Sequence, residues 1–140
     1  MSICTTPVAA ANRYLDQLMN LKADEFQQSL DANVVQHFSR KEGPYPQEAK
    51  VRQGAKEVFD AYKIGLFDTT TNIEVAKWAV DSDGLTATCT CVIDQDKDIP
   101  NGLKGRFRFK GNCRFDFVQS ESGDLKIKEI WDQSEVIRLK

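Results

Sequence analysis

Residues 105–119 read GRFRFKGNCRFDFVQ, and this stretch decides the fold. Four phenylalanines and Cys113 alternate in it with arginine, lysine, asparagine and aspartate, which is the period-two pattern of a β-strand with one apolar and one polar face. About fifteen extended residues would span roughly 50 Å at ~3.3 Å per residue, too far for one ordinary domain unless the strand coils or bulges. We therefore predict a strongly bent strand, with Gly111 at the bend.

The rest of the C-terminal half carries patterns of the same kind. Short turns that contain glycine separate its segments, so strands that are neighbours in the sequence should pair antiparallel. The further strands are expected over residues 73–80, 85–93 and 125–137.

The N-terminal part begins with a predicted helix. Thr5 and Thr6 offer a cap and Pro7 a first-turn residue, and apolar residues then recur at helical spacing as far as Met19. This pattern predicts an amphipathic helix that covers another element with one face.

A shorter second helix and a strand are expected next. Asp24 is the candidate cap, and Phe26 and Leu30 mark one face of this helix. A strand over residues 33–39 follows.

Residues 40–53 read as a loop of lid-like length. The run Gly43-Pro44-Tyr45-Pro46 forbids helix and removes two strand donors. Beyond Gly54, apolar residues at helical spacing as far as Phe67 predict a third helix whose apolar face can pack on a sheet.

Helices first and a long curved sheet afterwards is an α+β order. We expect three N-terminal helices packed in the concave face of a strongly curved, mainly antiparallel sheet, which gives a cone-like shape. A chain of 140 residues is near the commonest size for one domain, so residues 1–140 are expected to form a single domain with a small, largely apolar pocket.

The composition excludes several classes of partner. A formal net charge of −2 provides no basic footprint for nucleic acid, and no apolar run approaches the ~20 residues that cross a bilayer. The N-terminus lacks the basic-then-apolar order of a secretory signal, so we expect a cytoplasmic protein. Its four cysteines should then stay thiols that pack as small hydrophobic residues.

Five segments in order resemble the nuclear transport factor 2-like superfamily, and most of all its SnoaL-like polyketide cyclases and ketosteroid isomerases. The similarity covers nearly the whole chain, and it implies a conical fold that hosts isomerases, cyclases and dehydratases as well as non-catalytic binders. The segments are Ala11–Leu18, Ala23–Phe26, Asp31–Val34, Gly54–Phe59 and Lys126–Asp132.

The resemblance implies two catalytic candidates. Tyr14 matches the tyrosine of the first helix that donates a hydrogen bond to the substrate oxygen, and a phenol with a pKa near 10 keeps its proton at neutral pH. His37 falls where the isomerases have a carboxylate base, and imidazole is also suited to moving protons near neutrality. The other interpretations are a core tyrosine and a structural or solvent-facing histidine.

The family's second acid maps onto Cys113, and a thiol is too weak a donor to replace it. Asp132 is the remaining catalytic candidate, because other members place pocket acids on the last strand. Alternation leaves two possibilities open: either Trp131 and Glu129 line the pocket, or Asp132 and Ile130 do.

A mainly apolar ligand pocket is expected from this fold. Its expected lining comprises Phe26, Phe59, Tyr62, Trp78, Phe107, Cys113, Phe115 and Trp131.

Metal and cofactor chemistry receive little support from the sequence. Cys89, Cys91, Cys113 and His37 could be assembled into a zinc-ligand set, but a Cys-x-Cys pair lacks the usual spacing of a zinc knuckle. The sequence contains no glycine-rich phosphate loop and no nucleophile elbow. We expect neither a metal nor a cofactor.

Two functions from different classes remain. The first is a cofactor-independent acid/base enzyme, of isomerase, cyclase or dehydratase type, which acts on a small hydrophobic carbonyl or enol compound; His37 would move the proton and Tyr14 would polarise the oxygen. The second is a non-catalytic ligand binder or dimeric scaffold whose basic face meets a partner through Arg106, Arg108, Lys110 and Arg114. The resemblance also implies a homodimer formed through the exposed side of the sheet.

Overall fold

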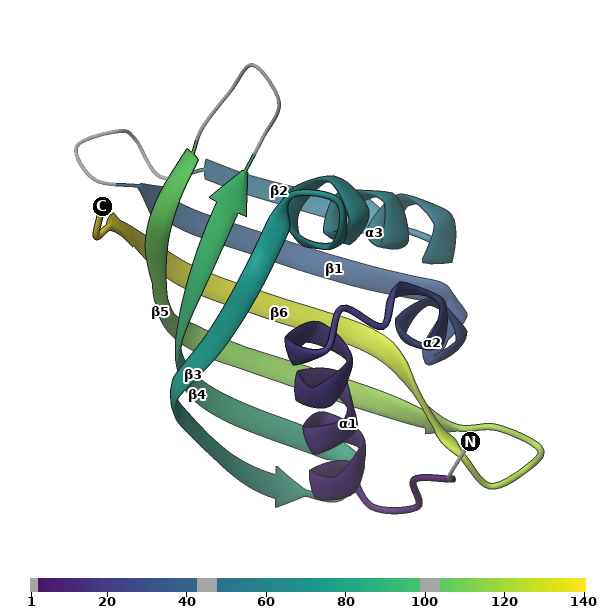
Figure 1. Cartoon of the computed structure of the whole chain (residues 1–140). Helices are drawn as coiled ribbons and strands as arrows, with labels where there is room; N and C mark the ends of the chain where they lie inside the picture. Colours follow the sequence, from purple (N-terminus) through teal and green to yellow (C-terminus); the bar gives the residue numbers. More distant parts are fainter. Residues whose placement is uncertain (1–2, 43–47, 99–103) are drawn as a thin grey trace.

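All the helices lie on one side of a strongly curved sheet (Figure 1). The computed structural model describes residues 3–42, 48–98 and 104–140. The elements in chain order are α1 (Pro7–Met19), α2 (Ala23–Gln28), β1 (Leu30–Glu42), β2 (Glu48–Gln53), α3 (Ala55–Tyr62), a π-helical turn (Lys63–Phe67), β3 (Thr70–Asp83), β4 (Thr86–Asp98), β5 (Lys104–Gln119) and β6 (Leu125–Arg138).

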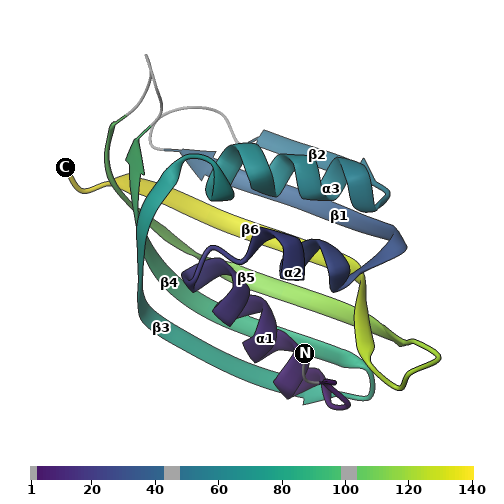
Figure 2. The same ribbon diagram turned by 45° about the vertical axis from the view of Figure 1, so that its right-hand side comes forward.

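Six strands form one sheet in the order β2-β1-β6-β5-β4-β3. Every pair is antiparallel except β1 with β6, which brings the first and last strands together in parallel next to the edge strand β2. This architecture confirms the predicted α+β fold with three N-terminal helices in the hollow of a mainly antiparallel sheet (Figure 2).

Helix α1 has the predicted bounds and cap. The Thr6 hydroxyl accepts a hydrogen bond from the backbone N–H of Ala9, and Pro7 occupies the first turn. The buried face of the helix packs on the sheet, and the Trp78 indole N–H of β3 donates to the Asn12 side-chain oxygen at 2.9 Å. The α1 face that the sequence marked as apolar is therefore the one that closes the hollow.

The prediction for α2 needs correction. The helix begins after Lys22, no side chain caps it, and Asp24 lies inside its first turn. Leu30 is not helical, because β1 already begins there. Phe26 is fully buried as predicted.

The loop predicted over residues 40–53 is wrong at both ends. Strand β1 continues through Glu42, and residues 48–53 form β2, which pairs with β1 from Val35↔Gln53 to Arg40↔Glu48. The remaining positions of the predicted loop, 43–47, lie outside the described residues. Polar sequence hid β2 because it is an edge strand that exposes most of its side chains.

The predicted third helix consists of two parts. Helix α3 ends at Tyr62, and the chain then continues as a π-helical turn. Tyr62 and Leu66 are buried, while Ile64 is 72% exposed. The end of this segment lies over the hollow, where it covers part of the sheet (Figure 2).

Strand β5 spans the sheet and bends strongly along its length (Figure 1). Its inward phenylalanines, Phe115 and Phe117, belong to the core between helices and sheet. The largest fully buried side chains are Phe26, Phe115, Leu125, Ile127 and Ile130, and each contributes roughly 1.5–3 kcal/mol through burial.

Candidate functional site

A cavity of about 370 Å³ lies between the helices and the concave face of the sheet, within the size range of small-molecule sites. Side chains of α1, α3, the π-helical turn and all six strands line it. The lining residues on which the argument depends are Tyr14, Tyr62, Cys91, Cys113, Asp132, Gln36, Phe38, Arg40, Arg52 and Gln95.

The alternation of β1 decides which of its side chains reach this cavity. Gln36, Phe38 and Arg40 line it, so His37 points to the other face of the sheet. The expectation that His37 and Tyr14 face one void is therefore wrong. The physical reason is register: shifting a strand by one position moves every side chain to the opposite face.

His37 has a polar and aromatic environment on the outer face. Its Nε2 is 2.6 Å from a carboxylate oxygen of Glu129, and its ring stacks on Trp131 with centroids 5.1 Å apart and planes 9° from parallel. The guanidinium of Arg114 lies over the same indole, 4.7 Å from its centroid. Trp131 and Glu129 thus belong to the outer face, and the pocket role expected for Trp131 is not compatible with this position.

Asp132 is the carboxyl group of the cavity. It points inward with Ile130, which settles the two possibilities that alternation left open. Burial raises the pKa of the Asp132 carboxyl, and the charges of Arg40 and Arg52 oppose this shift without cancelling it. A raised pKa makes the ionised carboxylate a stronger base than an exposed aspartate.

A pair of tyrosines faces the same space. The hydroxyls of Tyr14 and Tyr62 are 2.8 Å apart, so one donates a hydrogen bond to the other. Burial raises the pKa of both phenols, and the nearby Asp132 charge raises them further. Both hydroxyls therefore stay protonated at neutral pH. One hydroxyl hydrogen forms the hydrogen bond within the pair, and the other can be donated to a ligand oxygen.

Two thiols adjoin the Asp132 carboxyl. Cys113 is paired with Asp132 across β5 and β6, and its sulfur lies 4.0 Å from a carboxylate oxygen. A hydrogen bond between Cys113 and Cys91 lowers the pKa of Cys91 and raises that of Cys113. A carboxyl group of the neighbouring strand β6 thus adjoins the position onto which the resemblance mapped the family's second acid.

Cys91, which lines the cavity, and Cys89, which is buried in the core on the same strand, provide a prediction about reactivity. Burial raises the pKa of Cys89 to about 12, so about one molecule in ten thousand has this thiolate at pH 8. We expect iodoacetamide to modify Cys91 well before Cys89, as measured by mass spectrometry of digested protein over time. Equal rates at the two positions would contradict the prediction, and a ligand in the cavity should slow only Cys91.

Polar groups flank Asp132 along β1, β2 and β6. Arg52 donates from Nη1 to the Gln36 oxygen at 2.9 Å, and Arg40 donates from Nε to the Ser134 hydroxyl at 3.3 Å. Both guanidiniums lie over the Phe38 ring, at 4.8 Å and 4.6 Å from its centroid. The two arginines were not expected here, since residues 40–53 read as a loop. The period-two pattern Val34, Gln36, Phe38, Arg40 was the signal that could have found one of them.

Gln95 adds an acceptor to the cavity. It is 7% exposed, and within the described parts of the chain no group donates a hydrogen bond to its buried Oε1. A buried acceptor without a donor is costly. A hydroxyl or N–H group on a ligand could satisfy it.

The other residues expected in the pocket are divided between the cavity and the core. Tyr62, Trp78 and Cys113 line the cavity. Phe26 and Phe115 are fully buried in the core, and Phe59 is packed against that core. Phe107 is not among the lining residues; its ring lies under the guanidinium of Arg138 at 5.5 Å.

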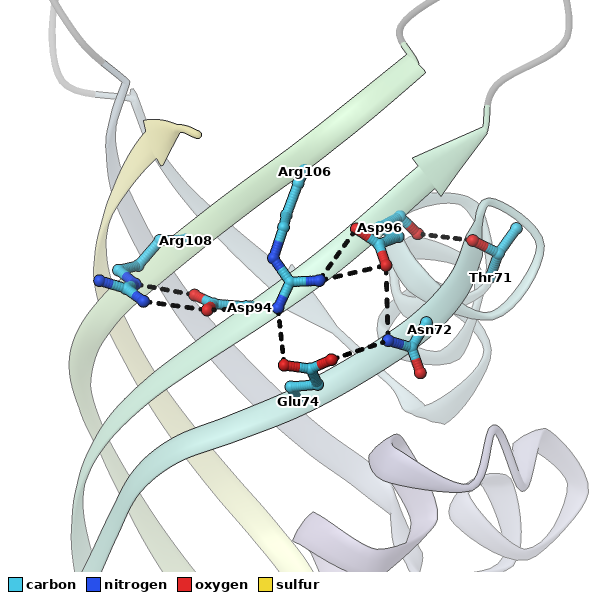
Figure 3. Close-up of polar contacts among 7 residues, drawn as sticks. All are labelled: Thr71, Asn72, Glu74, Asp94, Asp96, Arg106 and Arg108. Atoms are coloured by element: carbon cyan, nitrogen blue, oxygen red, sulfur yellow. Dashed lines mark hydrogen bonds and ion pairs between the residues drawn. The ribbon is translucent and has the colours of Figure 1, made fainter. Parts of the chain in front are cut away.

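The basic face expected on β5 is largely neutralised (Figure 3). Arg108 makes two hydrogen bonds to Asp94, at 2.8 Å and 3.0 Å, and Arg106 contacts Asp96 and Glu74. The Arg108 hydrogen bonds lower the pKa of Asp94 despite its burial. Two of the four cations proposed for a partner surface thus have acidic neighbours on β3 and β4.

Two further findings concern residues 3–42, 48–98 and 104–140. No cluster of three or more histidine, cysteine, aspartate or glutamate side chains there has the arrangement that a metal ion needs. No helix in these ranges has the length and apolar character of a membrane span.

Solved structures with the same arrangement identify the fold. A provisionally assigned SnoaL-like polyketide cyclase from Shewanella denitrificans matches with a TM-score of 0.68 at 8% identity, over 91% of this chain and 89% of that one. A ketosteroid isomerase-like protein from Erwinia carotovora atroseptica matches with a TM-score of 0.56 at 13% identity, over 94% of this chain and 92% of that one. An NTF2-like protein from Cytophaga hutchinsonii matches with a TM-score of 0.51 at 10% identity, over 91% of this chain and 93% of that one. No protein-family model and no curated protein matches the sequence.

The fold and the cavity together define an α+β cone with a chamber of small-molecule size. More specifically, the chain has the nuclear transport factor 2-like fold, which confirms the fold implied by the sequence resemblance. Sequence identities of 8 to 13% support an inference about the fold but not about an activity.

Proposed function

We propose that this protein is a cofactor-independent acid/base enzyme that removes or relocates a proton next to a carbonyl group of a small, largely apolar compound. One observation carries the proposal: a buried carboxyl of raised pKa, Asp132, shares an apolar cavity with the hydrogen-bonded hydroxyls of Tyr14 and Tyr62. A base and a protonated oxygen donor in one enclosed space are the two groups that enolisation requires.

The roles follow from protonation states. Asp132 in its ionised form accepts the proton from carbon, and burial favours its return to the neutral form. The tyrosine pair donates a hydrogen bond to the carbonyl oxygen as negative charge develops on it. Asp132 then returns the proton to carbon or to another atom of the substrate, so the reaction needs no external reactant. Asp132 thereby replaces His37 as the proton carrier.

The experiment is exchange of carbon-bound hydrogen for deuterium. Purified protein is incubated in deuterium oxide with 2-tetralone and with β,γ-unsaturated cyclohexenones, and NMR follows the loss of the proton signal next to the carbonyl. We expect faster exchange than in buffer, together with stabilisation of the protein by the same compounds in thermal denaturation. Ligands that stabilise the protein without any exchange would instead support a non-catalytic binder of the same fold.

Removing the tyrosine hydroxyls should slow this exchange. Tyr14→Phe or Tyr62→Phe leaves one phenol as donor, whereas the double variant leaves none, and we expect the double variant to be about a hundredfold slower. The rings stay, so their packing on Phe26 and Phe115 is kept. An unchanged rate in the folded double variant would refute the role of the pair.

Pairing of two copies through the outer face of the sheet stays a prediction. Sedimentation of the purified protein at several concentrations would measure it.

A further inference from the structure

Three cations line the cavity, Arg40, Arg52 and Lys97, and the chemistry above uses none of them. Lys97 donates to the backbone oxygen of Gly65 at 2.7 Å. Arg40 from β1 and Arg52 from β2 line the cavity at the β1–β2 side of the sheet, whereas helix α1 packs mainly on β3 and β4. Their guanidinium groups are held in place by Ser134 and Gln36 and by the Phe38 ring between them. Neither group is a freely moving surface side chain.

Neither guanidinium has a carboxylate partner among the residues that the structure describes. Each donates to a neutral oxygen, of Ser134 or of Gln36. Arginine elsewhere in this chain does find acids, as Arg13 does with Asp124 at 2.8 Å and Arg108 with Asp94 at 2.8 Å. The two cavity arginines therefore keep donor capacity that faces the space where a ligand would lie.

Asp132 does not satisfy this pair. Its carboxylate is near enough for both positive charges to act on it, yet within the described ranges no ion pair within 4.0 Å joins it to either arginine. In the register of β1 and β6, Phe38 is opposite Asp132 and Arg40 is opposite Ser134. Arg40 thus lies two residues beyond Asp132 along the strands, roughly 6.6 Å at ~3.3 Å per residue, whereas Arg52 is opposite Gln36, two residues before Phe38. The two arginines flank the level of Asp132, and both guanidiniums reach the Phe38 ring that lies opposite it.

We propose that the substrate of this cavity is an amphipathic carboxylate, whose carboxylate group binds Arg40 and Arg52 while its reactive carbon lies a few bonds away beside Asp132. The inference rests on the proposed function, because it names the substrate class of the same site. A planar guanidinium matches a carboxylate through two parallel N–H donors. A monoanion is favoured over a phosphate dianion because Asp132 carries like charge in the same chamber.

The apolar remainder of the substrate has a matching surface. Tyr14 and Leu18 of α1 line the part of the cavity over β3 and β4, so the charged head beside β1 and β2 and the hydrocarbon or aromatic body have separate parts of the lining. A fully apolar ligand would desolvate two guanidiniums that have only one neutral oxygen acceptor each, which is costly. Charge and shape thus favour a molecule with one acidic end.

The test compares two ligands that differ in charge and by one methyl group. Isothermal titration calorimetry measures 5-oxo-5-phenylpentanoate and its methyl ester on the unchanged protein, and deuterium exchange next to their ketone is followed in parallel. We expect the carboxylate to bind about ten- to a hundredfold more tightly, the range of a charge-assisted hydrogen-bond contact. Equal or tighter binding of the ester, or of the phosphonate analogue, would overturn the proposal.

Variants then locate the effect. Arg40→Gln and Arg52→Gln should each remove most of the preference for the carboxylate while leaving the affinity for the ester within about threefold. Arg114→Gln is the matched control, because Arg114 also lies over an aromatic ring but on the outer face. Loss of the preference in Arg114→Gln alone would contradict the assignment, and the two-ligand comparison on the unchanged protein remains decisive if a variant does not fold.

The outcomes separate this inference from the proposed function. Preference for the carboxylate without deuterium exchange in either bound ligand would refute the acid/base reaction and leave an anionic ligand site. Exchange in a bound ester that is preferred over the carboxylate would support the reaction and refute the substrate class.

Discussion

Replacing Asp132 by asparagine is expected to lower the rate of carbonyl-adjacent deuterium exchange by about a hundred- to ten-thousandfold, the usual contribution of a positioned general base. The amide keeps the size of the side chain but cannot accept the proton. The measurement is the NMR exchange rate of 2-tetralone with the unchanged protein and with Asp132→Asn at equal concentration. A variant that retains more than about a tenth of the rate would refute Asp132 as the base.

Two controls separate this effect from a change in structure. Asp83→Asn removes an exposed carboxylate from the end of β3, away from the cavity lining, and should leave the rate unchanged. His37→Ala tests the role that the resemblance implied for histidine. Because His37 lies on the outer face with Glu129 and Trp131, we expect its replacement to change the exchange rate by less than about threefold.

The same carboxyl links function to stability. A group whose pKa is raised by folding stabilises the folded protein at low pH and loses that contribution as pH rises through its folded-state pKa. Burial raises the pKa of Asp132 above its ordinary value of 3.8. As pH rises from the acidic range, the unfolding temperature of Asp132→Asn should therefore increase relative to that of the unchanged protein. Catalytic residues commonly lower the stability of a protein in this way.

The second large effect is expected at Gly111, at the centre of β5. Any Cβ at this position would collide with the backbone of β6: it would overlap the Gln133 carbonyl oxygen and approach the Ser134 Cα to 2.9 Å. Paired strands cannot move apart without breaking hydrogen bonds on both sides, so the strain cannot relax cheaply. We expect Gly111→Ala to lower the free energy of unfolding by about 3 kcal/mol or more, measured by urea denaturation.

Gly65 offers a matched control for that experiment. It lies in the π-helical turn and lines the same cavity, but no atom of the described residues would come within 4 Å of the methyl group that alanine adds, and its backbone is not left-handed. Gly65→Ala should be neutral or stabilising by up to about 1 kcal/mol. A loss at Gly65 as large as that at Gly111 would show that the steric argument is wrong.

Local patterns were sufficient for much of the fold. The alternation in β5 identified a long bent strand, and Thr6 with Pro7 identified the start of α1. The polar edge strand β2 escaped detection, because a strand with one neighbour and little burial carries no apolar signal. The start of β1 was also predicted too late, at Asn33. The first residues of this strand lie beside a register shift in its pairing with β6.

The candidate site shows the same division more sharply. The sequence alone was sufficient for the fold class, for the inward direction of Cys113, Phe115 and Phe117 on β5 and for the buried position of Tyr14 on α1, because these depend on periodicity within one element. Only the tertiary structure decided that Asp132 lies opposite Cys113, that Tyr62 meets Tyr14, that Arg40 and Arg52 share one chamber and that His37 lies outside it. The physical reason is that which face of a strand is buried, and which residues meet across strands, depends on pairing register between segments far apart in the chain, and a shift of one residue reverses the answer.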